Sequence, residues 1–169
     1  MDLILWRHAQ AEDLALDEAL SAEQGDVTIH IDPAKDLARR LTSKGERQAE
    51  RMAEWLNQRL PEGTRILVSP AQRTQQTALA LGRPFKTVKS LNPLASVDDL
   101  LRAAKWPTGR EPVLIVGHQP ILGMLAARLL TGNDFALSIK KGAVWWLRSR
   151  VRDGVAQVTL HAVQGPDFL

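Results

Sequence analysis

Two histidines and two arginines each follow a short apolar run in this chain. Arg7 and His8 come directly after residues 3–6, Arg73 comes shortly after residues 65–68, and His118 comes directly after residues 113–117. Apolar runs of this length predict buried strands, and open α/β sheets bind ligands at the carboxyl ends of their strands. We therefore expect the four side chains at one edge of a sheet. Guanidinium groups match phosphate oxygens and imidazole can attack phosphorus, so the pattern predicts a phosphate site.

Each of the four residues has an expected catalytic role. His8 is the candidate nucleophile, because an unprotonated imidazole nitrogen can form a covalent phosphohistidine that water later hydrolyses. Arg7 and Arg73 are candidate phosphate clamps, and His118 is expected to donate a hydrogen bond to the transferring phosphoryl oxygens. Arg7, Arg73 and His118 would thus also bind substrate. A metal site built from His8 and His118 is conceivable, but Arg7 would repel the cation, so no metal is expected.

The composition is that of an ordinary globular domain. The chain has 169 residues, of which 44 % are apolar and 24 % charged, and we expect one domain over residues 1–169. It contains no cysteine, which favours a reducing cytoplasm and excludes disulfides and thiolate metal sites. No apolar run approaches the length of a membrane span, and the amino terminus does not resemble a secretory signal. We therefore expect a cytoplasmic protein with no membrane contact.

Charge is unevenly distributed along the chain. Seven acids and no lysine or arginine lie between Ala11 and Ala34, and residues 12–32 are either a lid or docking surface or a solvated loop without a role. A late basic group follows, and it consists of Lys140, Lys141, Arg148, Arg150 and Arg152. Nucleic-acid binding is one interpretation, but no interleaved aromatic residues accompany the group. The sequence favours a solvated strand edge protected by charge, with no nucleic-acid partner.

Hydrophobic periodicity and turn residues predict the order of the elements. Strands are expected at 2–6, 65–68, 85–88, 113–116, 143–150 and 155–162, and helices at 43–60, 71–81, 97–104 and 120–131, with 12–24 a short helix or an ordered loop. Thr42 or Ser43 would cap the first long helix, with Glu46 as a capping-box partner, and Ser96 would cap the third. This alternation predicts an α/β fold: a three-layer α/β/α sandwich whose mostly parallel sheet gains an antiparallel edge from the final hairpin.

Five segments together resemble the histidine phosphatase superfamily, which has the phosphoglycerate-mutase-like fold. LILWRHAQAE is similar to its nucleophile segment, ILVSPAQRTQQTA to its second-arginine segment, and VLIVGHQPILGML to its second-histidine segment. DLARRLTSKGERQA and KKGAVWWL are similar to the SixA-type branch. The resemblance implies a nucleophilic His8, phosphate contacts from Arg7, Arg73 and His118, and no metal or organic cofactor. It also implies a phosphohistidine-containing protein as substrate, of the phosphorelay or phosphotransfer type, and a site that binds phosphate or its analogues.

Two departures from the family pattern affect the chemistry. Ala9 stands where the family usually has glycine, and it would be strained if that position required a positive φ. No clear general acid follows the middle strand, since Asp98 and Asp99 come a little late and are expected on a helix. A missing acid suits phosphohistidine, because an imidazole leaving group needs less proton assistance than an alkoxide.

Other functions remain open at this stage. A phosphatase acting on small phosphorylated molecules would need a carboxylic acid beside His8. A non-catalytic phosphoprotein-binding module could use the same fold, since a fold does not fix a function. The sequence leaves open the base that activates water, the role of the acidic segment and the oligomeric state. His30 and His161 have no comparable setting and are interpreted as structural.

Overall fold

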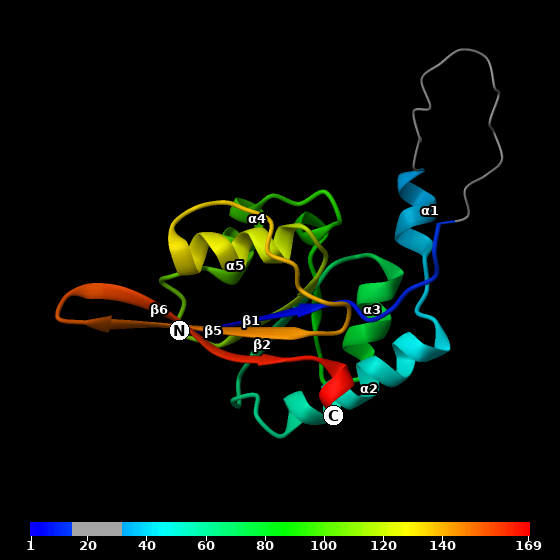
Figure 1. Ribbon diagram of the computed structural model, residues 1–169, viewed down its shortest axis with the longest axis horizontal. Helices are drawn as coiled ribbons and strands as arrows, with labels where there is room; N and C mark the ends of the chain where they lie inside the picture. The colour runs from blue at the N-terminus through cyan, green and yellow to red at the C-terminus, as the bar shows by residue number, and fades with distance from the viewer. Residues whose placement is uncertain (15–31) are drawn as a thin grey trace, which may run out of the picture.

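The computed structural model describes residues 1–14 and 32–169, and its centre is one six-stranded sheet (Figure 1). The strands are β1 (Asp2–Arg7), β2 (Arg65–Val68), β3 (Lys86–Thr87), β4 (Val113–Gly117), β5 (Val144–Arg152) and β6 (Val155–Gln164), in the order β3-β2-β4-β1-β5-β6. The pairs β3–β2, β2–β4 and β4–β1 are parallel, whereas β1–β5 and β5–β6 are antiparallel. The expected mixed sheet is confirmed.

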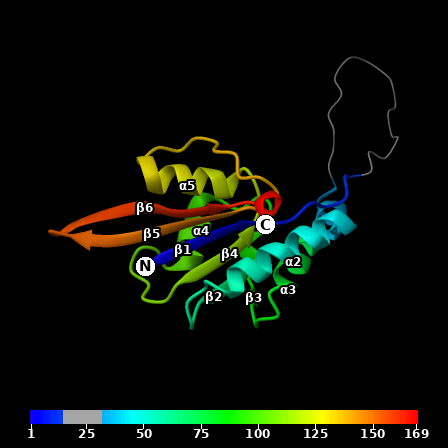
Figure 2. The same cartoon turned by 60° about the horizontal axis from the view of Figure 1, so that its bottom comes forward.

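Helices cover both faces of this sheet (Figures 1 and 2). They are α1 (Pro33–Ala38), α2 (Ser43–Asn57), α3 (Gln72–Leu79), α4 (Val97–Ala104) and α5 (Ile121–Thr131), with short 3₁₀ turns η1 (Lys89–Leu91) and η2 (Pro166–Phe168). One apolar cluster joins the sheet to α4 and α5, and a second joins the opposite face to α2 and α3. The three layers of the expected sandwich are therefore present.

Strand β1 shows why both faces must be covered. Its side chains alternate, so that Leu3 and Leu5 belong to the cluster under α4 and α5, while Ile4 and Trp6 belong to the cluster over α2 and α3. All four are fully buried. A strand buried on both faces has a continuous apolar sequence. The polar residues that follow it, Arg7 and His8, mark the place where the strand leaves the core.

The start of α2 lies close to the loop after β1. Thr42 caps the helix, and its hydroxyl accepts a hydrogen bond from the backbone N–H of Gly45. Glu46 is therefore not a capping-box partner, because the third helical position is Gly45. A Cβ atom on Gly45 would lie 1.9 Å from the carbonyl oxygen of Gln10, so this close approach requires glycine. The helix ends at Asn57, earlier than the periodicity predicts.

Helix α1 has no counterpart among the expected elements. It has six residues and none of them is buried, so its sequence has no apolar stripe from which a helix could be predicted. Asp32 caps its start, and its Oδ1 accepts from the N–H of Ala34. The element expected at 12–24, the acidic segment 12–32 and His30 lie mostly or wholly outside the described residues.

The final hairpin agrees in part with the sequence interpretation of a charged strand edge. β5 pairs with β6 as far as Arg152, but with β1 only as far as Arg148, and β6 is the outer strand of the sheet. Arg150 and Arg152 therefore lie where β5 is unpaired on the side of β1, whereas Arg148 is paired on both sides. As expected from strand alternation, Trp145 and Trp146 point to opposite faces and join different clusters. Within the described ranges, no helix is long and apolar enough to cross a membrane.

Candidate active site

Strand register brings the ends of three neighbouring strands together. Arg7 of β1 is opposite Gly117 of β4, and Val68 of β2 is opposite Val116 of β4. Each of these three strands is followed directly by a buried polar residue: His8 after β1, Ser69 after β2 and His118 after β4. The rings of His8 and His118 lie 5.4 Å apart between centroids. The two histidines that are distant in sequence are thus neighbours at the carboxyl edge of the sheet.

The ring of His8 is held by the backbone of the next residue. Its Nδ1 lies 2.7 Å from the carbonyl oxygen of Ala9. A carbonyl oxygen only accepts hydrogen bonds, so Nδ1 carries the proton and Nε2 of the neutral ring is unprotonated. Ala9 is in turn fixed, because its N–H donates to Oγ1 of Thr77 at 3.1 Å. Ala9 does not have a positive φ, so alanine causes no backbone strain at this position.

Burial keeps both histidines neutral. Loss of solvent, together with the charges of Arg73, Arg7 and Arg39, lowers the pKa of His8 to about 3, although its hydrogen bond to Ala9 acts in the opposite direction. Burial likewise lowers the pKa of His118 to about 2, with a second contribution from the charge of Arg73. A neutral His8 has a free electron pair on Nε2 at any ordinary pH, which is the state that a nucleophile requires.

His118 is oriented by a serine. Its Nε2 lies 2.6 Å from Oγ of Ser69, which is fully buried at the end of β2. Its Nδ1 is buried and has no hydrogen-bond partner within the described part of the chain. Two of the first N–H groups of α5 have partners within the chain. Leu122 N–H donates to the carbonyl of His118, and Gly123 N–H donates to Oε1 of Gln119.

Arg7 is anchored from the loop that follows α5. Its Nη1 donates to the carbonyl oxygen of Ile139 at 2.7 Å, while its Nε is buried and without a partner among the described residues. The loop itself lies tightly against α5, because a Cβ atom on Gly123 would come within 1.7 Å of the carbonyl oxygen of Leu137. The guanidinium position therefore depends on the close packing of α5 and this loop.

Arg73 is held by Asp36 of α1. Its Nη1 donates to the carbonyl oxygen of Asp36 at 2.6 Å, and its Nη2 donates to the carboxylate at 3.0 Å. The other carboxylate oxygen of Asp36 lies 3.1 Å from Nε of Arg39. One carboxylate thus bridges two guanidinium groups. Only 2 % of Arg73 is exposed, and its buried Nε has no hydrogen-bond partner among the described residues.

Four residues at this edge were not assigned a role from the sequence. They are Asp36, Arg39, Ser69 and Thr77. Thr77 links the two halves of the site, because its hydroxyl accepts from Ala9 and donates to the carbonyl of Arg73. Asp36 and Arg39 lie within the segment whose resemblance was noted, yet nothing in their spacing places them beside the sheet. Ser69 and Thr77 lie within the ILVSPAQRTQQTA segment, but that resemblance gave neither of them a role.

The two aspartates considered as proton donors are engaged elsewhere. Asp99 belongs to the capping box of α4, where its carboxylate accepts from Ser96 and pairs with Arg102. Asp98 pairs with Arg128 at 2.6 Å. Of the described acids, Asp36 is the one whose contacts reach a candidate site residue, and both of its oxygens face arginines.

This arrangement suits a tetrahedral oxyanion. Three guanidinium groups supply positive charge, and the buried nitrogens of Arg7, Arg73 and His118 that lack partners are hydrogen-bonding groups available to oxygen atoms. Beside them lies an unprotonated imidazole nitrogen. The chemistry that such a set supports is transfer of a phosphoryl group to His8.

Comparison with known proteins agrees with this geometry. Residues 3–96 match the family described as the histidine phosphatase superfamily, branch 1. The chain is 32 % identical over 169 residues to an uncharacterized protein of Picosynechococcus sp., with 95 % of this chain and 90 % of that protein covered. It is 34 % identical over 112 residues to the phosphohistidine phosphatase SixA of Escherichia coli, with 61 % of this chain and 69 % of that protein covered.

The fold has a close counterpart among solved structures. The structure of the protein histidine phosphatase SixA complexed with tungstate has a TM-score of 0.71 and 26 % sequence identity, with 99 % of both chains covered. The family match covers more than half of the chain, and the likeness to SixA extends over its whole length. The chain therefore belongs to the histidine phosphatase superfamily and, within it, is a SixA-type phosphatase.

Proposed function

We propose that this phosphatase removes phosphoryl groups from histidine side chains of a partner protein, through a covalent intermediate on His8. The observation that carries the proposal is the state of the acids around the site. Asp36 is bridged between Arg39 and Arg73, and Asp98 and Asp99 are paired at a distance from it. Asp36 is the described acid that contacts a candidate site residue, and it is not free to protonate a leaving group, which favours a substrate that needs little protonation.

In the first step, Nε2 of His8 attacks phosphorus. The new bond joins Nε2 to phosphorus, and the bond from phosphorus to the nitrogen of the substrate histidine breaks. The electron pair of the broken bond stays on the leaving imidazole, which takes a proton from solvent. Because Nδ1 of His8 donates to Ala9, the ring keeps its orientation and spreads the charge that develops on it.

Arg7, Arg73 and His118 are assigned to the phosphoryl oxygens. Guanidinium groups stabilise charge on these oxygens without needing to titrate, which supports the clamp role of Arg7 and Arg73. If the Ser69 hydroxyl donates to Nε2 of His118, the proton of that neutral ring lies on its free Nδ1, which then donates to an oxygen. Arg39 adds a third positive charge, since it contributes to the low pKa of both histidines.

In the second step, water attacks the phosphohistidine. The oxygen of water bonds to phosphorus, the bond to Nε2 of His8 breaks, and inorganic phosphate leaves while a proton passes to solvent. His8 returns to its neutral state, which its lowered pKa favours. The same cations stabilise this transition state, because the charge on the transferring group is similar in both steps.

The leaving group decides between substrate classes. An alkoxide released from a sugar or nucleotide phosphate is strongly basic and needs a proton donor in the transition state. Imidazole is a much weaker base and needs less protonation as it leaves. A protein phosphohistidine therefore suits this site better than a small phosphomonoester.

The test compares two substrates in parallel. Phosphate release is measured from a histidine-phosphorylated phosphotransfer protein and from p-nitrophenyl phosphate, for the wild type, His8→Ala and His161→Ala. His161 is an exposed histidine on β6, so its replacement serves as the matched control. We expect fast release from the protein, slow release from the ester, and loss of both only in His8→Ala.

Other results would change the assignment. Fast turnover of the small ester would indicate a small-molecule phosphatase and an acid that the geometry does not reveal. Binding of tungstate or phosphate without turnover of either substrate would indicate a non-catalytic phosphoprotein-binding module.

A further inference from the structure

The outer strand of the sheet, β6, has features that edge strands usually avoid. It has ten residues and one bulge, because His161 has no partner between the pairs Trp146–Ala162 and Leu147–Leu160. Its outer part, residues 155–160, has no bulge, no titratable side chain and no proline. Edge strands are normally short, charged, bulged or covered, because their outward N–H and C=O groups can pair with another chain. In the described part of the chain, the outward backbone groups of β6 have no partner beyond β5. This edge can therefore accept an additional strand.

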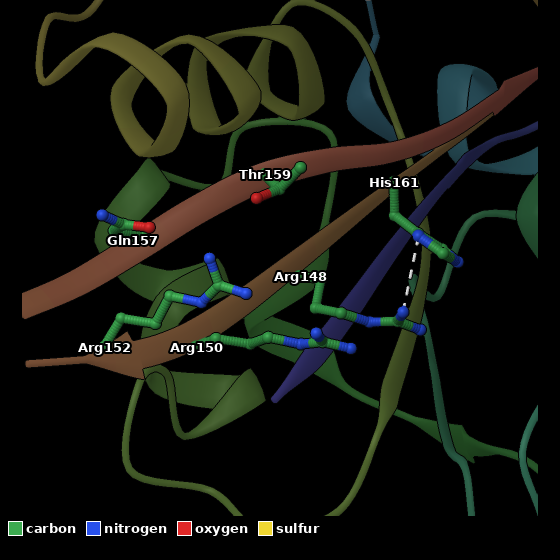
Figure 3. A pocket seen from close by; sticks show the side chains of 6 residues that line it. All are labelled: Arg148, Arg150, Arg152, Gln157, Thr159 and His161. Atoms are coloured by element: carbon green, nitrogen blue, oxygen red, sulfur yellow. Dashed lines mark hydrogen bonds between the residues drawn. The ribbon is translucent and has the colours of Figure 1, made fainter.

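A row of arginines lies one strand inward on β5. Arg148 is opposite Thr159, Arg150 opposite Gln157, and Arg152 opposite Val155, so each pair shares one face of the hairpin. A hollow of about 240 Å³ on this face is lined by Arg148, Arg150, Arg152, Gln157, Thr159 and His161, which we call the basic face (Figure 3). All six lining residues are basic or neutral.

Two of the three arginines are not neutralised by a described acid. Arg148 is neutralised, because its Nε and Nη2 both donate at 2.7 Å to the carboxylate of Asp2. Arg150 and Arg152 are exposed and form no ion pair with any described residue. The hairpin's acid, Asp153, lies in the turn and is likewise outside the described ion pairs. The basic face therefore presents uncompensated positive charge beside an open edge.

We propose that β6 pairs with an extended acidic segment of a partner protein, which bears Asp or Glu at every second position. Alternate residues of a strand lie roughly 6.8 Å apart on one face, which is also the spacing of Arg148, Arg150 and Arg152 along β5. An added strand with this pattern places its carboxylates on the same face as the arginine row. Its backbone supplies affinity and its carboxylates supply register and selectivity.

The opposite face of the hairpin suits the other residues of such a segment. Leu160 and Val151 both face away from the arginine row, and they are 40 % and 71 % exposed. Apolar or β-branched residues between the acids would contact this face. The preferred partner is thus an amphipathic strand in which acids alternate with residues such as valine or threonine.

Charge complementarity selects this occupant over two others. A second copy of the chain would present its own β6, which has no acid to pair with the arginines. A nucleic acid strand would meet positive charge, but Trp146 is only 4 % exposed, and the guanidinium of Arg59 lies over the ring of the nearby Trp55. Neither alternative uses both the unpaired backbone and the regular arginine spacing.

The surface is separate from the candidate active site. Because β5 runs antiparallel to β1, with Trp6 opposite Val144 and Asp2 opposite Arg148, Arg150 and Arg152 extend past the end of β1 that lies away from His8. Figures 1 and 2 show the tip of the hairpin projecting from the end of the sheet opposite to α1. Changes at this surface should leave the chemistry at His8 unaltered.

The experiment measures binding of a short fluorescent peptide with Glu at alternate positions, separated by Val and Thr. The variants are Arg150→Glu with Arg152→Glu, and the matched control Arg110→Glu, an exposed arginine outside the hairpin. We expect saturable binding to the wild type and the control, weakened about tenfold in the double variant and in high salt. Turnover of p-nitrophenyl phosphate should be equal in all three proteins.

Two further peptides test the backbone pairing. Each is N-methylated at one of the two alternating sets of residues, because only one set directs its N–H groups toward β6. Loss of binding with one set and retention with the other supports the proposal. Equal binding of all peptides to wild type and double variant would overturn it. So would a dimer that the peptide does not dissociate, or binding of a single-stranded oligonucleotide in place of the peptide.

Discussion

The carboxylate of Asp36 forms an ion pair with the guanidinium of Arg73, the residue assigned to bind the phosphoryl group. Nη2 of Arg73 donates to this carboxylate at 3.0 Å while Nη1 donates to the backbone carbonyl of the same residue at 2.6 Å. Asp36 thus orients the arginine through its backbone and competes with an anion through its side chain. The two functions can be separated by a substitution that removes only the charge.

Asp36→Asn should therefore strengthen phosphate binding. The backbone contact to Arg73 remains, while the negative charge that repels an incoming phosphoryl group is lost. We expect the inhibition constant of inorganic phosphate to fall about fivefold, which corresponds to about 1 kcal/mol. Asp13→Asn, at an exposed acid of the acidic segment, should leave it unchanged. An unchanged or higher inhibition constant in Asp36→Asn would mean that the carboxylate serves mainly to position Arg73.

The two buried histidines make stability depend on pH. Their pKa values are lowered to about 3 and about 2, so below the ordinary value of 6.5 the unfolded chain binds protons that the folded chain does not. Stability is consequently full above about pH 6.5 and is lost as the pH falls. Each histidine should cost about 1.3 kcal/mol between about pH 7.5 and 5.5.

Denaturant unfolding at both pH values measures this effect. The variant His8→Gln with His118→Gln should show a much smaller change in the free energy of unfolding than the wild type. His161→Gln, which removes an exposed histidine, should behave like the wild type. A double variant as pH-sensitive as the wild type would place the titrating groups elsewhere in the chain.

Ser69→Ala should lower the turnover number more than it changes KM. The substitution leaves Nε2 of His118 buried without its 2.6 Å partner and frees the ring to turn. Loss of one buried hydrogen bond of this kind costs about 1–3 kcal/mol, so a decrease of about fivefold to 150-fold is expected.

A double-mutant cycle tests whether Ser69 acts through His118. If it does, adding Ser69→Ala to His118→Gln should produce little further loss of turnover. Ser43→Ala, at the first residue of α2, serves as the control and should retain full activity. Independent, additive losses in the cycle would show that Ser69 has a role of its own.

Gly123→Ala should disturb Arg7 at a distance. The new Cβ atom would lie 1.7 Å from the carbonyl oxygen of Leu137, in the loop whose Ile139 carbonyl holds the guanidinium of Arg7. Because backbone must move to relieve this overlap, we expect a loss of about 1–3 kcal/mol in stability and a higher KM. Gly165→Ala is the control, since nothing lies within 4 Å of its Cβ position, and it should melt like the wild type.

Local features of the sequence determined the main elements and the candidate residues. Continuous apolar runs specify β1 and β4 because strands buried on both faces admit few polar side chains. Thr42 and Ser96 mark helix starts because their hydroxyls satisfy backbone N–H groups within a few residues. Arg7, His8 and His118 were recognisable because each follows such a run directly, and Arg73 because it opens the helix that comes next.

Tertiary structure decided which groups surround these candidates. The Asp36 bridge, the Ser69 contact to His118 and the Ile139 anchor of Arg7 join residues 37, 49 and 132 positions apart in the chain. No local pattern encodes such pairs, because a hydrogen bond between distant residues depends on how the elements pack. The same holds for the basic face, where the sequence shows the arginines but only the strand order shows that an uncharged edge lies beside them.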